Sequence, residues 1–210
     1  MFTQKSESRA PNTKKIAFDF WGWPSEISHE NCQRLINLGK DSWNEAFTYG
    51  SEHSIIKKDD FRKSDVVWVK DQWVYDLIWD YMASANEQAG WKYDIVASED
   101  SQITRYNKDE FYAWHRDGLG SHIELLDTSR DVHKTSNLYG NARKLSMSVL
   151  LNDDYEGGNF QMHGQKKDDT LIQGEGSIIV FPSFIDHQVT PVTKGTRYSL
   201  VTWFVGPPFV

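Results

Sequence analysis

Short apolar runs separated by turn residues fill the second half of this 210-residue chain, and they constrain its fold more than any other feature. The clearest run is residues 144–151, where Leu145, Met147, Val149 and Leu151 alternate with other side chains. Alternation with a period of two is typical of a β-strand that places one face on a core. We expect strands over residues 102–106, 110–115, 144–151, 159–163, 171–172, 177–181, 187–189 and 198–205. Eight strands are enough to close a double-sheet jelly roll.

Helical periodicity dominates the first half of the chain. A strand over residues 16–23 precedes a helix within residues 25–40, for which Ser28 is the expected N-cap. A longer helix is expected over residues 70–90, because its apolar residues recur at three- and four-residue steps and Gly90 suits the position after its end. We therefore predict an α+β, mainly β fold in which N-terminal helices pack on one sheet of the jelly roll.

The length is that of one domain, which we assign to residues 1–210. Residues 1–14 are expected to be a loose N-terminus, residues 16–98 to supply supporting helices and strands, and residues 100–206 to form the jelly-roll core. Residues 118–142 are a long polar insert in that core. A loop of this length inside a compact domain usually serves function, for example as an active-site lid, or else is disordered. We predict a lid.

Composition excludes several classes of protein. The chain is 39% hydrophobic and 14% aromatic, which indicates a globular fold. Cys32 is the single cysteine, so there is neither an intramolecular disulfide nor a thiolate cluster for zinc. Residues 1–15 lack the apolar segment of a signal peptide, and no apolar run reaches the roughly 20 residues of a membrane span. We expect a cytoplasmic protein, and its formal charge of −7 argues against bulk nucleic-acid binding.

Two histidines and one aspartate are the candidate metal ligands. His115 and Asp117 are two residues apart, so on a strand their side chains would project from one face. His187 begins another expected strand, and strands that are distant in sequence become neighbours in a jelly roll. Two imidazoles and a carboxylate form the facial triad of iron(II) oxygenases, which leaves positions open for a co-substrate and O2.

A second pair of residues suits a dicarboxylic acid. Arg197 and Ser199 are two apart on the last expected strand and share a face. A guanidinium is permanently charged and can form two parallel hydrogen bonds to a carboxylate, and the serine hydroxyl can add a further hydrogen bond. A buried arginine paired with a side-chain carboxylate of the protein is the alternative explanation.

Taken together, these residues resemble the prolyl 4-hydroxylase-like branch of the Fe(II)/2-oxoglutarate-dependent dioxygenases. The resemblance covers roughly residues 100–206 and rests on Tyr106, His115-Arg116-Asp117, residues 144–153, Tyr155-Glu156-Gly157-Gly158 and the segment from Phe181 to Ser199. It extends more faintly to the N-terminal helices and Arg62-Lys63-Ser64. It implies a double-stranded β-helix, which is the jelly roll already expected.

The resemblance also implies a role for each matching residue. His115, Asp117 and His187 match the iron ligands, and Arg197 with Ser199 matches the group that binds the distal carboxylate of 2-oxoglutarate. Tyr106 matches a tyrosine of the co-substrate pocket, Trp203 an aromatic residue near the iron, and Tyr112, Arg62 and Ser64 match substrate residues. Fe(II), 2-oxoglutarate and O2 are the implied cofactors, with ascorbate as a family expectation.

Strand parity and one departure from the family pattern bear on these roles. Tyr112 is off-parity with His115, and so is Trp114, which should pack behind the strand. Some prolyl hydroxylases have a tyrosine where this chain has Leu150-Leu151, so one hydrogen bond to the co-substrate is missing or supplied elsewhere.

The implied reaction hydroxylates an unactivated C–H, for which we expect a prolyl residue of a peptide or protein, with release of succinate and CO2. Three alternatives stay open. The same chemistry would serve a free amino acid, a siderophore or a nucleobase, although the acidic charge disfavours the last. A cupin-like domain would bind metal without turnover. A zinc hydrolase would also use two histidines and an acid, but the chain has no His-Glu-x-x-His.

Overall fold

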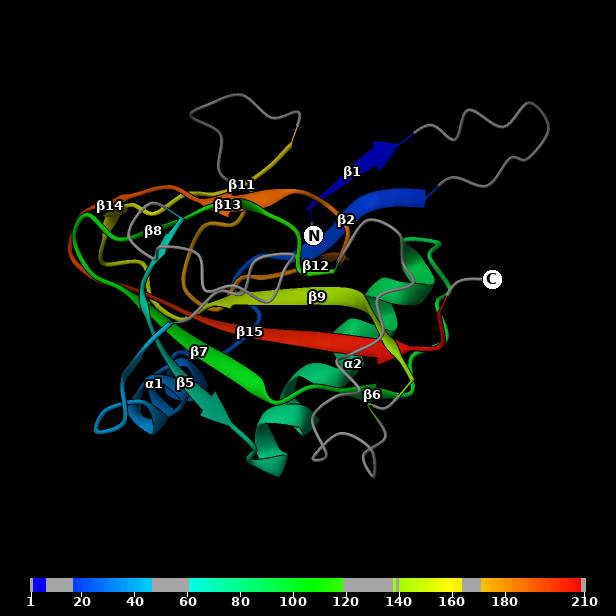
Figure 1. The fold of residues 1–210 in the computed structure, drawn as a ribbon, viewed down its shortest axis with the longest axis horizontal. Helices are drawn as coiled ribbons and strands as arrows, with labels where there is room; N and C mark the ends of the chain where they lie inside the picture. Colours follow the sequence, from blue (N-terminus) through cyan, green and yellow to red (C-terminus); the bar gives the residue numbers. More distant parts are fainter. Residues whose placement is uncertain are drawn as a thin grey trace.

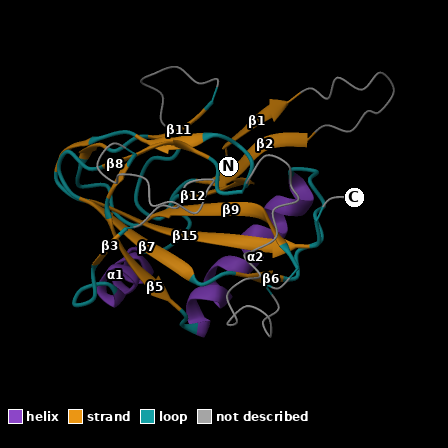
Figure 2. Cartoon of the chain, in the orientation of Figure 1, coloured by secondary structure: helices purple, strands orange, loops and turns teal. Residues whose placement is uncertain are grey.

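The computed structural model describes residues 2–6, 17–46, 61–118, 138, 140–163 and 171–208. These residues form two helices and fifteen strands (Figures 1 and 2). The helices are α1 (His29–Leu38) and α2 (Gln72–Gln88). The strands are β1 (Phe2–Ser6), β2 (Ala17–Trp23), β3 (Asn44–Glu45), β4 (Arg62–Lys63), β5 (Asp65–Val69), β6 (Ala97–Ser98), β7 (Ser101–Tyr106), β8 (Phe111–His115), β9 (Ala142–Leu150), β10 (Glu156–Gly157), β11 (Phe160–Met162), β12 (Ile178–Pro182), β13 (His187–Val189), β14 (Val192–Lys194) and β15 (Arg197–Gly206).

Both expected helices are confirmed, and their ends follow the capping signals in the sequence. The hydroxyl of Ser28 accepts a hydrogen bond from the Asn31 main-chain N–H at 3.3 Å and so caps α1. Gly90 follows α2 with a φ of 79°, a left-handed conformation that favours glycine. The buried stripe of α2 consists of Val74, Ile78, Met82 and Ala85.

The strands form the two facing sheets of a double-stranded β-helix, which confirms the predicted fold. The large sheet has the order β1-β2-β12-β9-β15-β7-β5-β3, with β6 beside β15, and the small sheet has the order β11-β13-β8-β4. Strands β10 and β14 form a separate pair. Figure 1 shows β8, β11 and β13 on one side of β9 and β15 and both helices on the other side.

Strand β9 separates two apolar cores. Its residues Leu145, Met147 and Val149 pack with the helices in the first core, together with Leu151 just beyond the strand, as their alternation predicts. Leu150 faces the opposite way, into a second core that lies between the sheets. The second core contains Phe20, Tyr106, Leu150, Phe160, Met162, Ile172, Ile179, Phe181, Val189 and Val192. The site described below lies on this inner side.

Some local expectations were wrong. Residues 171–172 are not a strand: Ile172 is buried in the second core and the Leu171 N–H donates to the Phe160 carbonyl, so core packing explains this apolar pair. Residues 2–6, within the N-terminus that was expected to be loose, form β1, which pairs antiparallel with β2. Strands β3, β4, β5, β6, β10 and β14 were not predicted either, and all of these six but β5 have two or three residues. Most of the expected lid, residues 118–142, lies outside the described residues. Neither described helix has the length and apolar character needed to cross a membrane.

Candidate metal centre and co-substrate pocket

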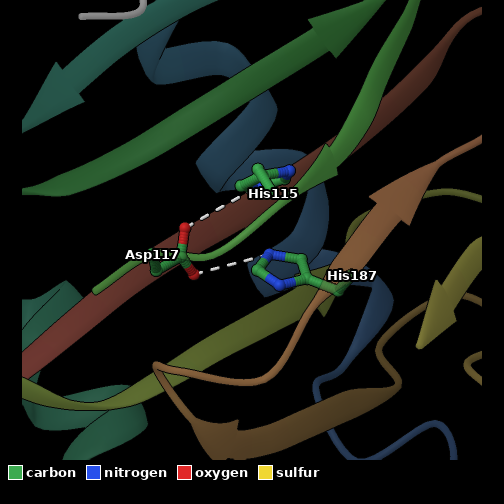
Figure 3. A group of neighbouring side chains, drawn as sticks. All are labelled: His115, Asp117 and His187. Carbon is green, nitrogen blue, oxygen red and sulfur yellow. Dashed lines mark ion pairs between the residues drawn. The ribbon is translucent and has the colours of Figure 1, made fainter. Parts of the chain in front are cut away.

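Two neighbouring strands of the small sheet hold the candidate metal ligands. His115 ends β8, His187 begins β13, and the two residues are cross-strand partners. Asp117 follows β8 by two residues and faces both rings (Figure 3). Its two carboxylate oxygens lie 3.6 Å from His115 Nε2 and 3.5 Å from His187 Nε2. One ligand atom from each residue therefore lies within 4.8 Å of the other two.

Main-chain hydrogen bonds fix the orientation of all three groups. His115 Nδ1 donates to the Ala113 carbonyl at 2.8 Å, and His187 Nδ1 donates to the Ile185 carbonyl at 2.9 Å. Each Nε2 is thereby left as the lone-pair nitrogen that points toward Asp117. The Asp117 N–H donates to the Ser183 carbonyl at 3.0 Å, which ties the carboxylate to the end of β12. The chain therefore presents two imidazole Nε2 atoms and one carboxylate at a fixed point.

The protonation states of these groups suit a metal. Burial lowers the pKa of His187 from 6.5 to about 4, so the ring is neutral and its lone pair is available at pH 7. Burial alone would raise the pKa of Asp117, but His187, His115 and the nearby Arg143 outweigh it and hold that pKa below its usual value. Asp117 Oδ2 is buried and has no hydrogen-bond partner. A divalent cation would supply that missing partner, and this donor set is the one that iron(II) takes.

Arg197 occupies the inner side of the large sheet and is 1% exposed. Its Nη1 donates to the Ser199 hydroxyl at 3.0 Å, and its guanidinium lies 5.5 Å from the ring centroid of Tyr106, its cross-strand partner. Among the residues that the structure describes, no carboxylate lies within 4.0 Å of this guanidinium, and its Nε has no hydrogen-bond partner. A paired structural role, the alternative left open by the sequence, therefore does not account for Arg197.

Tyr106 connects the arginine pocket to the metal ligands. Burial raises the pKa of its hydroxyl, and the charges of Arg62 and Arg197 act in the opposite direction. The charge of Asp117 acts on this hydroxyl as well, in the direction that raises its pKa. Leu150, part of the Leu150-Leu151 departure from the family pattern, lies across from Ser199 and belongs to the same apolar core as Tyr106. The arrangement suits a dicarboxylate that reaches from the metal to Arg197.

Residues 101–205 match the family described as the 2OG-Fe(II) oxygenase superfamily, and this match spans half of the chain. The chain belongs to this superfamily. Membership identifies the cofactor and co-substrates for which the triad and the arginine pocket are suited, namely iron(II), 2-oxoglutarate and O2.

Relatives of this oxygenase carry the name PKHD-type hydroxylase. One from Alteromonas mediterranea is 33% identical over 103 residues, which cover 48% of this chain and 41% of that protein. Another from Maricaulis maris is 33% identical over 129 residues, which cover 57% of this chain and 58% of that protein. In both cases the matched segment spans less than two thirds of the relative.

Solved structures confirm the fold of the oxygenase over most of its length. A prolyl-4-hydroxylase from Pseudomonas putida superposes with a TM-score of 0.61 at 19% identity and covers 89% of this chain and 91% of that chain. The viral collagen prolyl hydroxylase of Paramecium Bursaria Chlorella virus-1, solved as a 2OG complex, also gives 0.61 at 19% identity, with 90% and 96% covered.

A β-bulge explains why the parity argument failed for β8 of the oxygenase. His187 pairs with His115 and Val189 pairs with Tyr112, so between these pairs two residues of β8, Ala113 and Trp114, oppose one residue of β13, Gln188. The extra residue brings the Tyr112 ring onto the His115 ring, with centroids 3.5 Å apart and planes 13° from parallel. The prediction that Trp114 packs behind the strand was wrong, because this side chain is 43% exposed.

The residues expected to contact substrate, Arg62, Ser64 and Tyr112, do lie together. Strand β4 pairs with β8, which places Arg62 opposite Tyr112. The Arg62 guanidinium lies 4.5 Å from the Tyr112 ring centroid, and its Nε donates to the Ser64 hydroxyl at 2.9 Å. Arg62 is 6% exposed, so a surface salt bridge does not describe it.

Trp203, which was expected near the iron, contacts Arg143. Arg143 and its partner Glu99 are two residues that the sequence analysis did not identify. The Arg143 guanidinium lies 4.2 Å from the Trp203 ring centroid and forms an ion pair with Glu99 through Nε and Nη2. Arg143 Nη1 also donates to the main-chain oxygen of Asp117 at 2.9 Å. Arg143 and Glu99 are 44 residues apart and belong to no motif, so nothing in the sequence pointed to them.

Gly158 is a further residue whose importance only the structure reveals. Its φ is 59°, and a Cβ at this position would lie 2.9 Å from Arg197 Cδ. The missing side chain leaves room for the stem of the arginine. The Gly157-Gly158 turn was visible in the sequence, but its contact with Arg197 was not.

Proposed function

We propose that this chain is an Fe(II)- and 2-oxoglutarate-dependent dioxygenase that hydroxylates a prolyl residue of a peptide or protein and releases succinate and CO2. One observation carries the proposal: a two-histidine, one-carboxylate cluster lies beside a buried arginine that has no carboxylate partner among the described residues. The triad accounts for the metal and the arginine accounts for the distal carboxylate of the co-substrate.

Iron(II) held by three protein ligands would couple the oxidative decarboxylation of 2-oxoglutarate by O2 to the oxidation of a C–H bond. The protein contributes binding and orientation. Arg197 and Ser199 would bind the distal carboxylate, and the neutral Tyr106 hydroxyl would donate a hydrogen bond in the same pocket. The Nδ1 bonds of His115 and His187 hold both rings in the metal-binding tautomer.

The prolyl substrate is supported by the names of the relatives and of the structural neighbours. Several relatives are PKHD-type hydroxylases, and one neighbour is a prolyl hydroxylase from Trichoplax adhaerens in complex with a peptide fragment. We assign Tyr112, Arg62 and Ser64 to the substrate side of the iron and Trp203 to its surroundings, because all four are largely buried near the ligands. Ascorbate dependence and a cytoplasmic location complete the proposal.

The first test is succinate formation from 2-oxoglutarate with Fe(II), with and without short proline-rich peptides, and with mass spectrometry of the peptides. Peptide-stimulated turnover with a gain of one oxygen atom, abolished in His187→Ala, is the expected result. Arg197→Met should retain iron but require a far higher 2-oxoglutarate concentration for turnover, because the guanidinium that would bind the distal carboxylate is lost. This variant separates the co-substrate pocket from the metal centre.

Other outcomes select between the remaining functions. Slow, unstimulated succinate formation that requires His187 would retain the dioxygenase and reject the peptide substrates, which leads to free amino acids or siderophores. Bound iron without any succinate would reject the enzyme in favour of a cupin-like metal-binding domain. Hydrolytic activity that requires zinc and is insensitive to 2-oxoglutarate would identify the zinc hydrolase.

A further inference from the structure

The oxygenase contains the same arginine–serine pair twice. Arg62 and Ser64 are two residues apart around β4, and Arg197 and Ser199 are two residues apart on β15. In each pair the guanidinium donates to the hydroxyl, at 2.9 Å and 3.0 Å respectively. Arg62 is 6% exposed and Arg197 1% exposed. Within the described part of the chain, neither guanidinium has a carboxylate within 4.0 Å.

Arg62 faces the reaction site from the small sheet. Its guanidinium covers one face of the Tyr112 ring, and Tyr112 stacks on the metal ligand His115. Arg197, in the large sheet, lies 5.5 Å from the Tyr106 ring centroid, and the charges of both Arg62 and Arg197 act on the Tyr106 hydroxyl. Arg62 is thus a buried cation separated from the candidate metal ligand His115 by one aromatic ring.

Three carboxylates near these residues have other partners. Asp117 belongs to the metal centre. Glu110, which also acts on the Tyr106 hydroxyl, accepts hydrogen bonds from the main-chain and side-chain N–H groups of Asn107. Glu99 is paired with Arg143. None of these carboxylates pairs with Arg62.

We propose that Arg62, oriented by Ser64, binds a carboxylate of the substrate, so that the preferred substrate is an anionic prolyl compound. This inference rests on the proposed function and specifies its substrate. Arg62 Nε is held by the Ser64 hydroxyl, which leaves the terminal amino groups to form a bidentate pair with the incoming carboxylate. The carboxylate belongs either to an acidic side chain beside the proline or to the terminal carboxyl of a C-terminal or free proline.

Equilibrium binding tests the proposal without turnover. The protein is loaded with Fe(II) and 2-oxoglutarate under anaerobic conditions, and dissociation constants are measured for two matched pairs of compounds. A Pro-Glu peptide amide against its Pro-Gln counterpart reports on an acidic side chain, and N-acetylproline against its amide reports on the terminal carboxyl. The wild-type protein should prefer the charged member of one pair by about 10- to 100-fold.

Two variants assign that preference. Arg62→Gln should bind the charged and neutral members equally while retaining 2-oxoglutarate. Lys63→Gln removes the same charge from the neighbouring exposed residue of β4 and should keep the full preference. The pair therefore separates a contact with Arg62 from the general electrostatic field of the protein.

Several results would overturn the proposal. The wild-type protein could bind both members of each pair equally, or bind none of the four compounds while it retains 2-oxoglutarate; each result rejects an anionic substrate but leaves the dioxygenase intact. If Arg62→Gln weakened iron binding and both members alike, Arg62 would serve only to support His115. Failure of the wild-type protein to bind 2-oxoglutarate would reject the proposed function and this inference together.

Discussion

Arg143 donates a hydrogen bond from Nη1 to the main-chain oxygen of Asp117 at 2.9 Å. The same guanidinium is bound through Nε and Nη2 to Glu99, so its position does not depend on its bond to Asp117 alone. With the Asp117 N–H bound to Ser183, both sides of this residue's backbone are held. Arg143 is therefore a positioning residue for the carboxylate that faces the two imidazoles.

Replacing Arg143 should weaken iron binding. Arg143→Lys keeps the charge but cannot hold Glu99 and the Asp117 carbonyl together, and outer groups of this kind typically contribute about 10- to 100-fold to metal affinity. Arg105→Lys is the matched control, because Arg105 also pairs with a carboxylate, Asp65, and lies 4.6 Å from the Trp43 ring centroid. Anaerobic competition with a chelator measures the dissociation constants. Equal weakening in both variants would assign the effect to general destabilisation.

Truncating Tyr112 should also weaken iron binding, because the aromatic ring of Tyr112, and not its hydroxyl, supports His115. Tyr112→Phe keeps the face stacked on His115, whereas Tyr112→Ala removes it. Since such aromatic pairs contribute about 0.5–1.5 kcal/mol, iron affinity should fall about 2- to 10-fold in the alanine variant and remain unchanged in the phenylalanine variant. The same chelator competition checks this. Loss of iron affinity in Tyr112→Phe would show that the hydroxyl is needed at the metal centre.

Gly158→Ala should raise the KM for 2-oxoglutarate. The new Cβ would lie 2.9 Å from Arg197 Cδ and would displace the arginine, and small displacements of a binding group lower catalytic efficiency by about 10-fold or more. Gly140→Ala is the control, because its φ is 76° but no atom of the described residues lies within 4 Å of the added Cβ. Both variants should lose roughly 1–2 kcal/mol of stability from their left-handed backbone. Steady-state kinetics would disprove the contact if the two KM values matched.

The stability of the chain should fall at alkaline pH because of Cys32. Burial, with help from the charge of Glu175, raises the pKa of this thiol from 9.0 to about 12. Above pH 9 the unfolded chain releases a proton that the folded protein keeps, so the free energy of unfolding decreases as pH rises from 9 to 12. At pH 10 the thiol accounts for about 1.4 kcal/mol of that decrease. Urea unfolding at pH 8 and pH 10 should show a smaller decrease in Cys32→Ala, and equal decreases would contradict the assignment.

Periodicity in the sequence was sufficient for the helices and the long strands, because each buries one face. Helix α2 and strand β9 follow their apolar patterns closely. The very short strands β3, β4, β6, β10 and β14 carry no pattern of their own, since two or three residues cannot show a period. Their pairing depends on neighbours that are distant in the chain.

The sequence predicted those site residues whose types are restricted by the chemistry of metal and carboxylate binding. It did not predict those whose positions depend on backbone geometry. Two histidines, an aspartate and an arginine suit few tasks, so their spacing pointed to the metal and the dicarboxylate. Because of the β8 bulge, Tyr112 lies on the face of His115 and Trp114 is exposed. The two-residue alternation of a regular strand does not predict this arrangement. The Arg143–Glu99 pair depends on the folded arrangement alone.

The triad joins two of the shorter strands of the molecule, since β8 has five residues and β13 has three, while β9 and β15 have nine and ten. A metal ion bound across β8 and β13 acts as a cross-link between them. Local opening of the small sheet separates the ligands, so the free energy of metal binding adds to the energy of that opening. Amide hydrogens of β8 and β13 will exchange slowly when iron is bound and faster when it is removed, while those of β9 and β15 report global unfolding. Iron is therefore a structural element of the small sheet as well as a reagent.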